Sequence, residues 1–208
     1  MLDASTATQM FDRATSDWHE GQSAFLPASP ASSQRDALQR AILNLHRANF
    51  DLWHEEDKAR DPAATDAQIA AVKRAIDRLN QQRNDLVELC DKLLLASLPS
   101  VSAMTGSAPA APLHSETPGM MLDRLSILTL KIYHTAEEVE RANAPPGHAE
   151  RNRDRLAVLQ SQREDLAACL DRLWDDVLHG RRRFKLYQQM KMYNDPSLNP
   201  AVYAARKS

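Results

Sequence analysis

Two stretches of the chain, 80 residues apart, carry apolar residues at alternating spacings of three and four, and an arginine interrupts both at the same place. This spacing puts each set on one face of a helix that packs against another helix. A guanidinium on such a face needs a carboxylate or a bound anion, because an unpaired buried charge is strongly destabilising. The first stripe is Ile69, Val72, Ile76, Leu79, Arg83, Leu86, Cys90 and Leu93; the second is Ala149, Asn152, Leu156, Leu159, Arg163, Leu166, Leu170 and Leu173.

The same 80-residue offset aligns residues outside the apolar stripes. The run Leu-x-x-Gln-Arg-x-Asp-Leu occurs at 79–86 and again at 159–166, and Asp91 matches Asp171. In the segments that precede these runs, His54 matches His134. Regular helical spacing explains the matching leucines but not the matching polar residues. The sequence therefore predicts an internal duplication.

Each copy has the pattern of a helical hairpin. We predict helices over about 34–60 and 66–96 in the first hairpin (34–96), with Thr65 and Gln68 forming a capping box at the second start. A linker loop (97–117) leads to the second hairpin (118–178), which begins at Thr117-Pro118 and breaks at Pro145-Pro146-Gly147 into helices 118–142 and 149–178.

A leading helix (about 4–19) and a basic C-terminal helix (181–195) flank the hairpins. The predicted fold is all-α, an antiparallel four-helix bundle made of two duplicated hairpins with additional N- and C-terminal helices, in one domain over 1–208.

The composition narrows the class of protein. The net charge is −2, but residues 179–208 carry +6, so an acidic body ends in a basic segment, unlike a general nucleic-acid binder. There is no basic and apolar leader, and prolines interrupt the uncharged stretch 93–113, so we expect a cytoplasmic protein without a membrane span. Cys90 and Cys169 lie among stripe leucines, which predicts two small buried thiols.

The predicted helix 118–142 is apolar nearly all round, which favours a central position. Hairpin geometry places Arg163 within reach of Asp123, so we predict an ion pair between them. No acid occupies the matching place in the first copy, and Arg83 must pair with Glu56 or Asp57, with the other hairpin, or with a ligand. The polar residues of the central helix, forced into partly buried positions, are Asp123, Arg124, Ser126, Lys131 and His134.

His54 and His134, each followed by acids, could be combined into a two-fold metal site. Their spacing matches neither His-Glu-x-x-His nor Glu-x-x-His, and a histidine hydrogen-bonded near a hairpin end explains both equally well. Glycine-rich phosphate loops and nucleophile elbows are also missing from the sequence. We therefore predict neither a metal nor a cofactor.

The basic C-terminal segment carries Phe184, Tyr187 and Met190 at helical spacing among cations. Such a helix can dock on the bundle and present positive charge to a phosphate-bearing ligand, or its cations can simply offset the acidic body. The candidate ligand-binding residues are Asp123, Arg124, Lys131, His134, Arg83, Arg163, Arg183, Tyr187 and Lys191.

Several runs are similar to a bacterial domain family of unknown function, number four-two-five-four. They are Glu116-Thr117-Pro118-Gly119, Leu122-Asp123-Arg124-Leu125-Ser126-Ile127-Leu128, Leu130-Lys131-Ile132-Tyr133-His134 and Lys191-Met192-Tyr193-Asn194-Asp195-Pro196. The resemblance covers about residues 35–203. It implies a Gram-negative source and genes that lie beside glycosyltransferases of envelope polysaccharide assembly, but it supplies no catalytic residues to carry over.

Three functional hypotheses follow. The first is a non-catalytic binding module that serves a glycosyltransferase, binding it or an anionic small molecule such as a phosphorylated sugar or lipid intermediate. The second is an enzyme acting on a sugar or nucleotide phosphate, with His134 as acid–base and Arg124 or Lys131 as electrostatic clamp. The third is a structural homodimer. Convergence of the central polar residues in one pocket would favour a ligand, whereas dispersal into separate pairs would favour assembly.

Overall fold

The computed structural model describes residues 3–22, 33–98, 111–188 and 197–199, and those residues form five helices and no strand. The all-α prediction is confirmed, and every helix begins and ends within two residues of its predicted bounds. The helices are α1 (Ala4–His19), α2 (Gln34–Lys58), α3 (Asp66–Ser97), α4 (Pro118–Glu140) and α5 (His148–Leu178).

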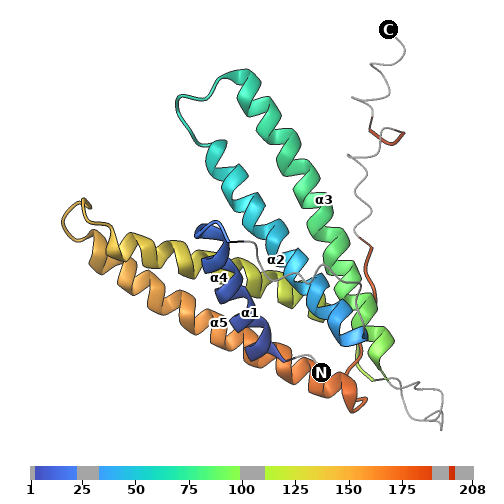
Figure 1. Cartoon of the computed structure of the whole chain (residues 1–208). Helices are drawn as coiled ribbons and strands as arrows, with labels where there is room; N and C mark the ends of the chain where they lie inside the picture. Colours follow the sequence, from blue (N-terminus) through green and yellow to red (C-terminus); the bar gives the residue numbers. More distant parts are fainter. Residues whose placement is uncertain (1–2, 23–32, 99–110, 189–196, 200–208) are drawn as a thin grey trace.

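The four long helices form two antiparallel hairpins, α2/α3 and α4/α5, as predicted. Figure 1 shows that the hairpins meet at their open ends and diverge toward their connecting turns, while α1 lies across α4 and α5. Helix α1 also contacts α2, so this short helix touches both hairpins. The result is a helical bundle whose two halves are held together at one end.

Local sequence signals set the helix starts. The Thr65 side chain and Gln68 form the predicted capping box at α3, satisfying backbone N–H groups that have no partner within the helix. Thr117 caps α4 by accepting a hydrogen bond from the N–H of Met120, and Pro118 occupies the first turn. Gly147, with φ of +74°, makes the reversal between α4 and α5 in a conformation that favours glycine.

The hydrophobic core lies where the open ends of the hairpins meet α1. It takes residues from the first half of α1, α2 and α4 and from the last half of α3 and α5, together with Phe184. Burial of such large apolar side chains is the main favourable contribution to folding. The largest fully buried apolar side chains among them are Phe11, Leu45, Leu94, Leu122, Leu125 and Leu170.

Except for the exposed Ile69, the residues of the two apolar stripes are buried or half-buried, but the cysteines differ. Cys90 is buried and burial raises the pKa of its thiol to about 12. Cys169 is exposed, so the prediction of a second buried thiol was wrong. The physical reason is its position: Leu170 points into the core, and the preceding residue lies about 100° away around the helix.

Arg83 of α3 and Arg163 of α5, which match at the 80-residue offset, each pair with an acid on a helix outside their own hairpin. Arg83 of α3 pairs with Asp123 of α4, with 3.7 Å between Nε and Oδ1. Its equivalent in α5, Arg163, pairs with Asp12 of α1, with 2.6 Å between Nη1 and Oδ1. The predicted Arg163–Asp123 pair was therefore wrong, and Arg83 has its carboxylate in the other hairpin.

The matching aspartates repeat this relationship. Asp91 of α3 accepts a hydrogen bond of 2.7 Å from the N–H of Gly119, at the start of α4. Asp171 of α5 accepts one of 2.9 Å from the N–H of Ala4, at the start of α1. Each carboxylate thus satisfies a free N–H in the first turn of a neighbouring helix. The first turn of α1 therefore contacts α5 in the same way that the first turn of α4 contacts α3.

The predicted basic helix over 181–195 does not form in its first part. Gly180, with φ of +69°, ends α5, and residues 181–188 are not helical. Arg183 forms a parallel β-bridge with Leu113, in which its N–H donates to the carbonyl oxygen of Pro112 and its own carbonyl accepts from His114. Phe184 is buried, so core packing and backbone pairing replace helical hydrogen bonds here. Residues 189–195 lie outside the described residues.

Among the residues that the structure describes, none of the helices combines the length and the apolar character needed to cross a bilayer.

Candidate functional site

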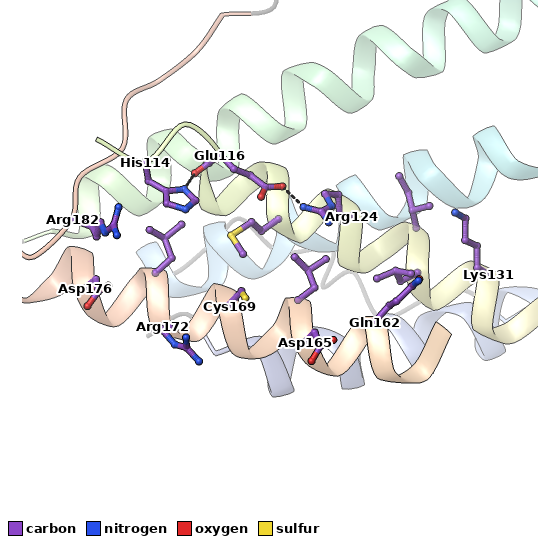
Figure 2. Close-up of a pocket in the computed structure, with 15 residues that line it drawn as sticks. His114, Glu116, Arg124, Lys131, Gln162, Asp165, Cys169, Arg172, Asp176 and Arg182 are labelled. Carbon is purple, nitrogen blue, oxygen red and sulfur yellow. Dashed lines mark hydrogen bonds and ion pairs between the residues drawn. The ribbon is translucent and has the colours of Figure 1, made fainter. Parts of the chain in front are cut away.

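A groove runs between α4 and α5, closed at one end by the segments on either side of the β-bridge (Figure 2). Its volume is about 900 Å³. The groove-lining residues come from 114–116, from one face of each helix and from Arg182. They are His114, Glu116, Met121, Arg124, Ile127, Leu128, Lys131, Gln162, Asp165, Leu166, Cys169, Arg172, Leu173, Asp176 and Arg182.

The charged groups of the groove are cations along its length, with fewer acids. Figure 2 shows Lys131 at one end and Arg182 at the other, with Arg124 between them. The guanidinium of Arg124 donates to Glu116 at 2.7 Å. Lys131, Arg172 and Arg182 form no ion pair with any described residue. These three cations are therefore available to an anion.

Two acids reduce this positive charge. Asp176 already binds Arg181, which lies outside the groove lining, at 2.7 Å. The remaining acid, Asp165, occupies the α5 side of the groove. After these pairings the groove keeps an excess of positive charge, so it attracts anions rather than cations.

Apolar side chains separate the charged ones. Ile127 and Leu128 of α4 face Leu166 and Leu173 of α5 across the groove, with Met121 beside them. This combination suits a ligand that has both a non-polar part and negative groups. Charged contacts then orient the ligand, and apolar contacts contribute affinity through burial.

A second set of polar residues is buried at the α2–α4 contact. His46 is fully buried, and its Nδ1 lies 2.8 Å from the hydroxyl of Ser126 while its Nε2 lies 3.1 Å from the carbonyl oxygen of Phe11. Asn49 donates to Asp123 at 2.9 Å and to Ser126 at 3.0 Å. Burial lowers the pKa of His46 to about 3, so its imidazole is neutral at pH 7. This network joins helices and presents no open surface.

The structure separates the sequence-predicted residues into three places. Arg124 and Lys131 line the groove. Asp123 and Arg83 lie together at the contact between α3 and α4. His134 is not in the groove, because its ring stacks on Trp53 of α2.

The other predicted residues also lie apart from the groove. Arg163 pairs with α1 on another face of α5. The side chain of Arg183 donates from Nε to the carbonyl oxygen of Ala111 at 2.8 Å, and Tyr187 is exposed. Lys191 lies outside the described residues.

Sequence reasoning missed two of the cations that line the groove, Arg172 and Arg182. Arg172 lies between the matched Asp171 and the stripe residue Leu173, and both Arg172 and Leu173 line the groove. The position of Arg172 beside the apolar stripe was the signal in the sequence. Arg182 was missed because the sequence analysis predicted a helix at 181–195. Neighbouring side chains at a β-bridge point to opposite sides. Arg182 therefore reaches the groove, while the side chain of Arg183 reaches the carbonyl oxygen of Ala111.

The fold and the groove define an all-helical protein of two long hairpins, with a charged cleft between the helices of the second. The family model described as "Protein of unknown function (DUF4254)" matches residues 39–186, and the chain belongs to this family. The match covers both hairpins and the segment through Phe184. No curated protein and no solved structure matches the chain.

Proposed function

We propose that this protein is a non-catalytic binding module that takes an anionic ligand into the groove between α4 and α5. One observation carries the proposal: Lys131, Arg172 and Arg182 lie around one groove with apolar lining residues, and none of the three has a carboxylate partner among the described residues. Cations without partners cost stability through mutual repulsion, and an anion placed between them relieves that cost.

The chemical class of the ligand follows from the layout of the groove. The cations are spread along its length rather than gathered at one point, which suits an elongated molecule with more than one negative group. The apolar lining residues suit a sugar ring or an acyl segment. We propose a phosphorylated sugar or lipid intermediate as the ligand, or an acidic segment of a partner such as a glycosyltransferase.

The biological setting remains part of the proposal. The resemblance to the four-two-five-four family implies a place beside envelope polysaccharide assembly, and we propose a cytoplasmic role there. The homodimer is the second candidate, and it is supported by the dispersal of Asp123 and His134 away from the groove that Arg124 and Lys131 line. The enzyme stays a prediction, and no contact between a nucleophile and a base among the groove-lining residues supports it.

The test uses calorimetric titration of the full chain with pyrophosphate and with UDP-glucose. The variant Lys131→Ala/Arg182→Ala should weaken binding at least tenfold, whereas the matched variant Lys73→Ala/Arg153→Ala should leave it unchanged. Lys73 and Arg153 are exposed, pair with acids of their own helices and lie outside the groove. Equal weakening by both variants would contradict the proposal, as would failure of the native chain to bind either probe.

A further inference from the structure

Three histidines from three helices meet where α1, α2 and α4 come together. His19 is the last residue of α1, His54 lies near the end of α2 and His134 lies in the second half of α4. Their imidazole centroids are 5.1 to 5.8 Å apart. One ring nitrogen from each lies within 4.8 Å of the other two. The duplication thus supplies two equivalent histidines, and α1 supplies a third.

Hydrogen bonds fix which nitrogen of each ring is free. Nδ1 of His19 lies 2.8 Å from the carbonyl oxygen of Thr15, and Nδ1 of His54 lies 2.8 Å from that of Phe50. A carbonyl oxygen only accepts, so Nδ1 must carry the proton in both rings. Nδ1 of His134 bonds in the same way to the carboxylate of Glu137, also at 2.8 Å. In each neutral ring, Nε2 therefore carries a lone pair.

These lone pairs are left without donors. Nε2 of His19 and Nε2 of His134 are buried and have no hydrogen-bond partner among the described residues. A buried acceptor without a partner loses its hydration and gains no hydrogen bond in return, which destabilises the folded chain. Lone pairs held close together also repel one another. A cation bound between them removes both costs.

We propose that His19, His54 and His134 bind one divalent transition-metal ion through Nε2, with Zn²⁺ as the best match. Imidazole is a preferred ligand of zinc, copper, nickel and iron. With metal–nitrogen bonds of about 2.0–2.1 Å, tetrahedral ligands lie about 3.4 Å apart, so the rings must close by roughly an ångström. The sequence-based expectation of no metal considered His54 and His134 without the third ligand.

The surroundings of the rings suit a metal site. Each Nδ1–H donates to an oxygen, the arrangement that orients histidine ligands and raises their basicity. Trp53 stacks on His134 with centroids 4.8 Å apart, and Tyr133 stacks on His19 at 4.4 Å, which restrains both ring planes. Three protein ligands leave a fourth coordination position for water or an anionic ligand.

This inference is independent of the anion-binding groove, because none of the three histidines lines that groove. The full chain, treated with a chelator and then titrated with ZnCl₂ in a calorimeter, should bind one ion per chain. Zn²⁺ should also raise the thermal midpoint, because an ion that binds only the folded state stabilises it. His19→Gln, His54→Gln and His134→Gln should each weaken binding at least tenfold.

Two control variants separate this site from other ligands. His179→Gln removes an exposed histidine at the end of α5, and Cys169→Ser removes an exposed thiol; both should bind Zn²⁺ like the native chain. If the histidine variants do not fold, the Co²⁺ absorption spectrum of the native chain decides. Ligand-field bands without thiolate charge transfer support the site. Charge transfer from a thiolate, or failure to bind one ion per chain, overturns it.

Discussion

The carboxylate of Asp91, on α3, accepts a 2.7 Å hydrogen bond from the backbone N–H of Gly119 at the first turn of α4. The two helices approach so closely here that a Cβ at residue 119 would lie 2.6 Å from the carbonyl oxygen of Val87. Glycine is thus required by space rather than by backbone conformation. Burial outweighs the hydrogen bonds from Thr117 and Gly119 and raises the pKa of Asp91 to about 6.

Asp91 makes the contact between the hairpins sensitive to pH. Its pKa in the folded chain exceeds the ordinary value of 3.8, so the folded state binds more protons and this group's contribution to stability falls as pH rises from about 4 to about 6. As pH rises over that range, the free energy of unfolding of the neutral variant Asp91→Asn should increase by up to about 3 kcal/mol relative to that of the native chain. Urea unfolding of both proteins at pH 4.5 and pH 7 measures the change, and a constant difference would contradict it.

His46 should act in the opposite direction. Its folded pKa of about 3 lies below the ordinary 6.5, so the stability that depends on its neutral form is complete above pH 6.5 and is lost as pH falls toward 3. At pH 5 this loss is about 2 kcal/mol. The variant His46→Phe should be less stable at pH 7, because Ser126 and Thr15 lose a partner, yet show a smaller decrease between pH 7 and pH 5. An unchanged decrease would assign the acid sensitivity to other groups.

The equivalent arginines should differ in energetic weight. Arg83→Ala leaves the carboxylate of Asp123 half-enclosed at the α3–α4 contact, and we expect a loss of about 1–3 kcal/mol. Arg163→Ala should cost about 1 kcal/mol or less, because its partner Asp12 is 48% exposed and surface ion pairs contribute little. Chemical denaturation of the two variants compares them directly. Double-mutant cycles with Asp123→Asn and Asp12→Asn give each coupling energy.

The burial of Phe184 provides a test of how residues 181–188 pack against the bundle. Because this side chain is buried in the core, Phe184→Ala should cost about 3–5 kcal/mol. Tyr187→Ala, three residues on and 41% exposed, should change stability by about 0.5 kcal/mol or less. Thermal unfolding of both variants provides the measurement. Similar small losses would mean that the segment does not pack against the bundle in solution.

Helix positions were predictable because the relevant signals are local. Apolar spacing, the Thr65 capping box and the Thr117-Pro118 start each act within a few residues of the chain. The 80-residue offset also matched Arg83 with Arg163 and Asp91 with Asp171, and these residues make corresponding contacts in the structure. Those signals were sufficient for the hairpins.

The partners of the matched residues were not predictable from hairpin register alone. Register places Arg163 near α4, but α1, from a distant part of the sequence, packs against the side of α5 that carries Arg163 and brings Asp12. Likewise, the meeting of His19 with His54 and His134 depends on where α1 packs. Helical spacing at 184–190 also misled, because a left-handed glycine and a bridge to Leu113 determine the conformation of 181–188.

The matched contacts of α3 and α5 place α4 and α1 in equivalent positions, each against the second helix of a hairpin. At the first hairpin, Arg83 and Asp91 hold the helix that opens the next hairpin; at the second, Arg163 and Asp171 hold α1. Helix α1 therefore covers the face of α5 that corresponds to the face of α3 on which α4 packs. A chain that lacks residues 1–22 would expose the surface of α5 around Arg163 and Asp171. The α4 helix of another copy could then pack on that surface, as it packs on α3. Head-to-tail association of such truncated chains into open polymers is the expected consequence.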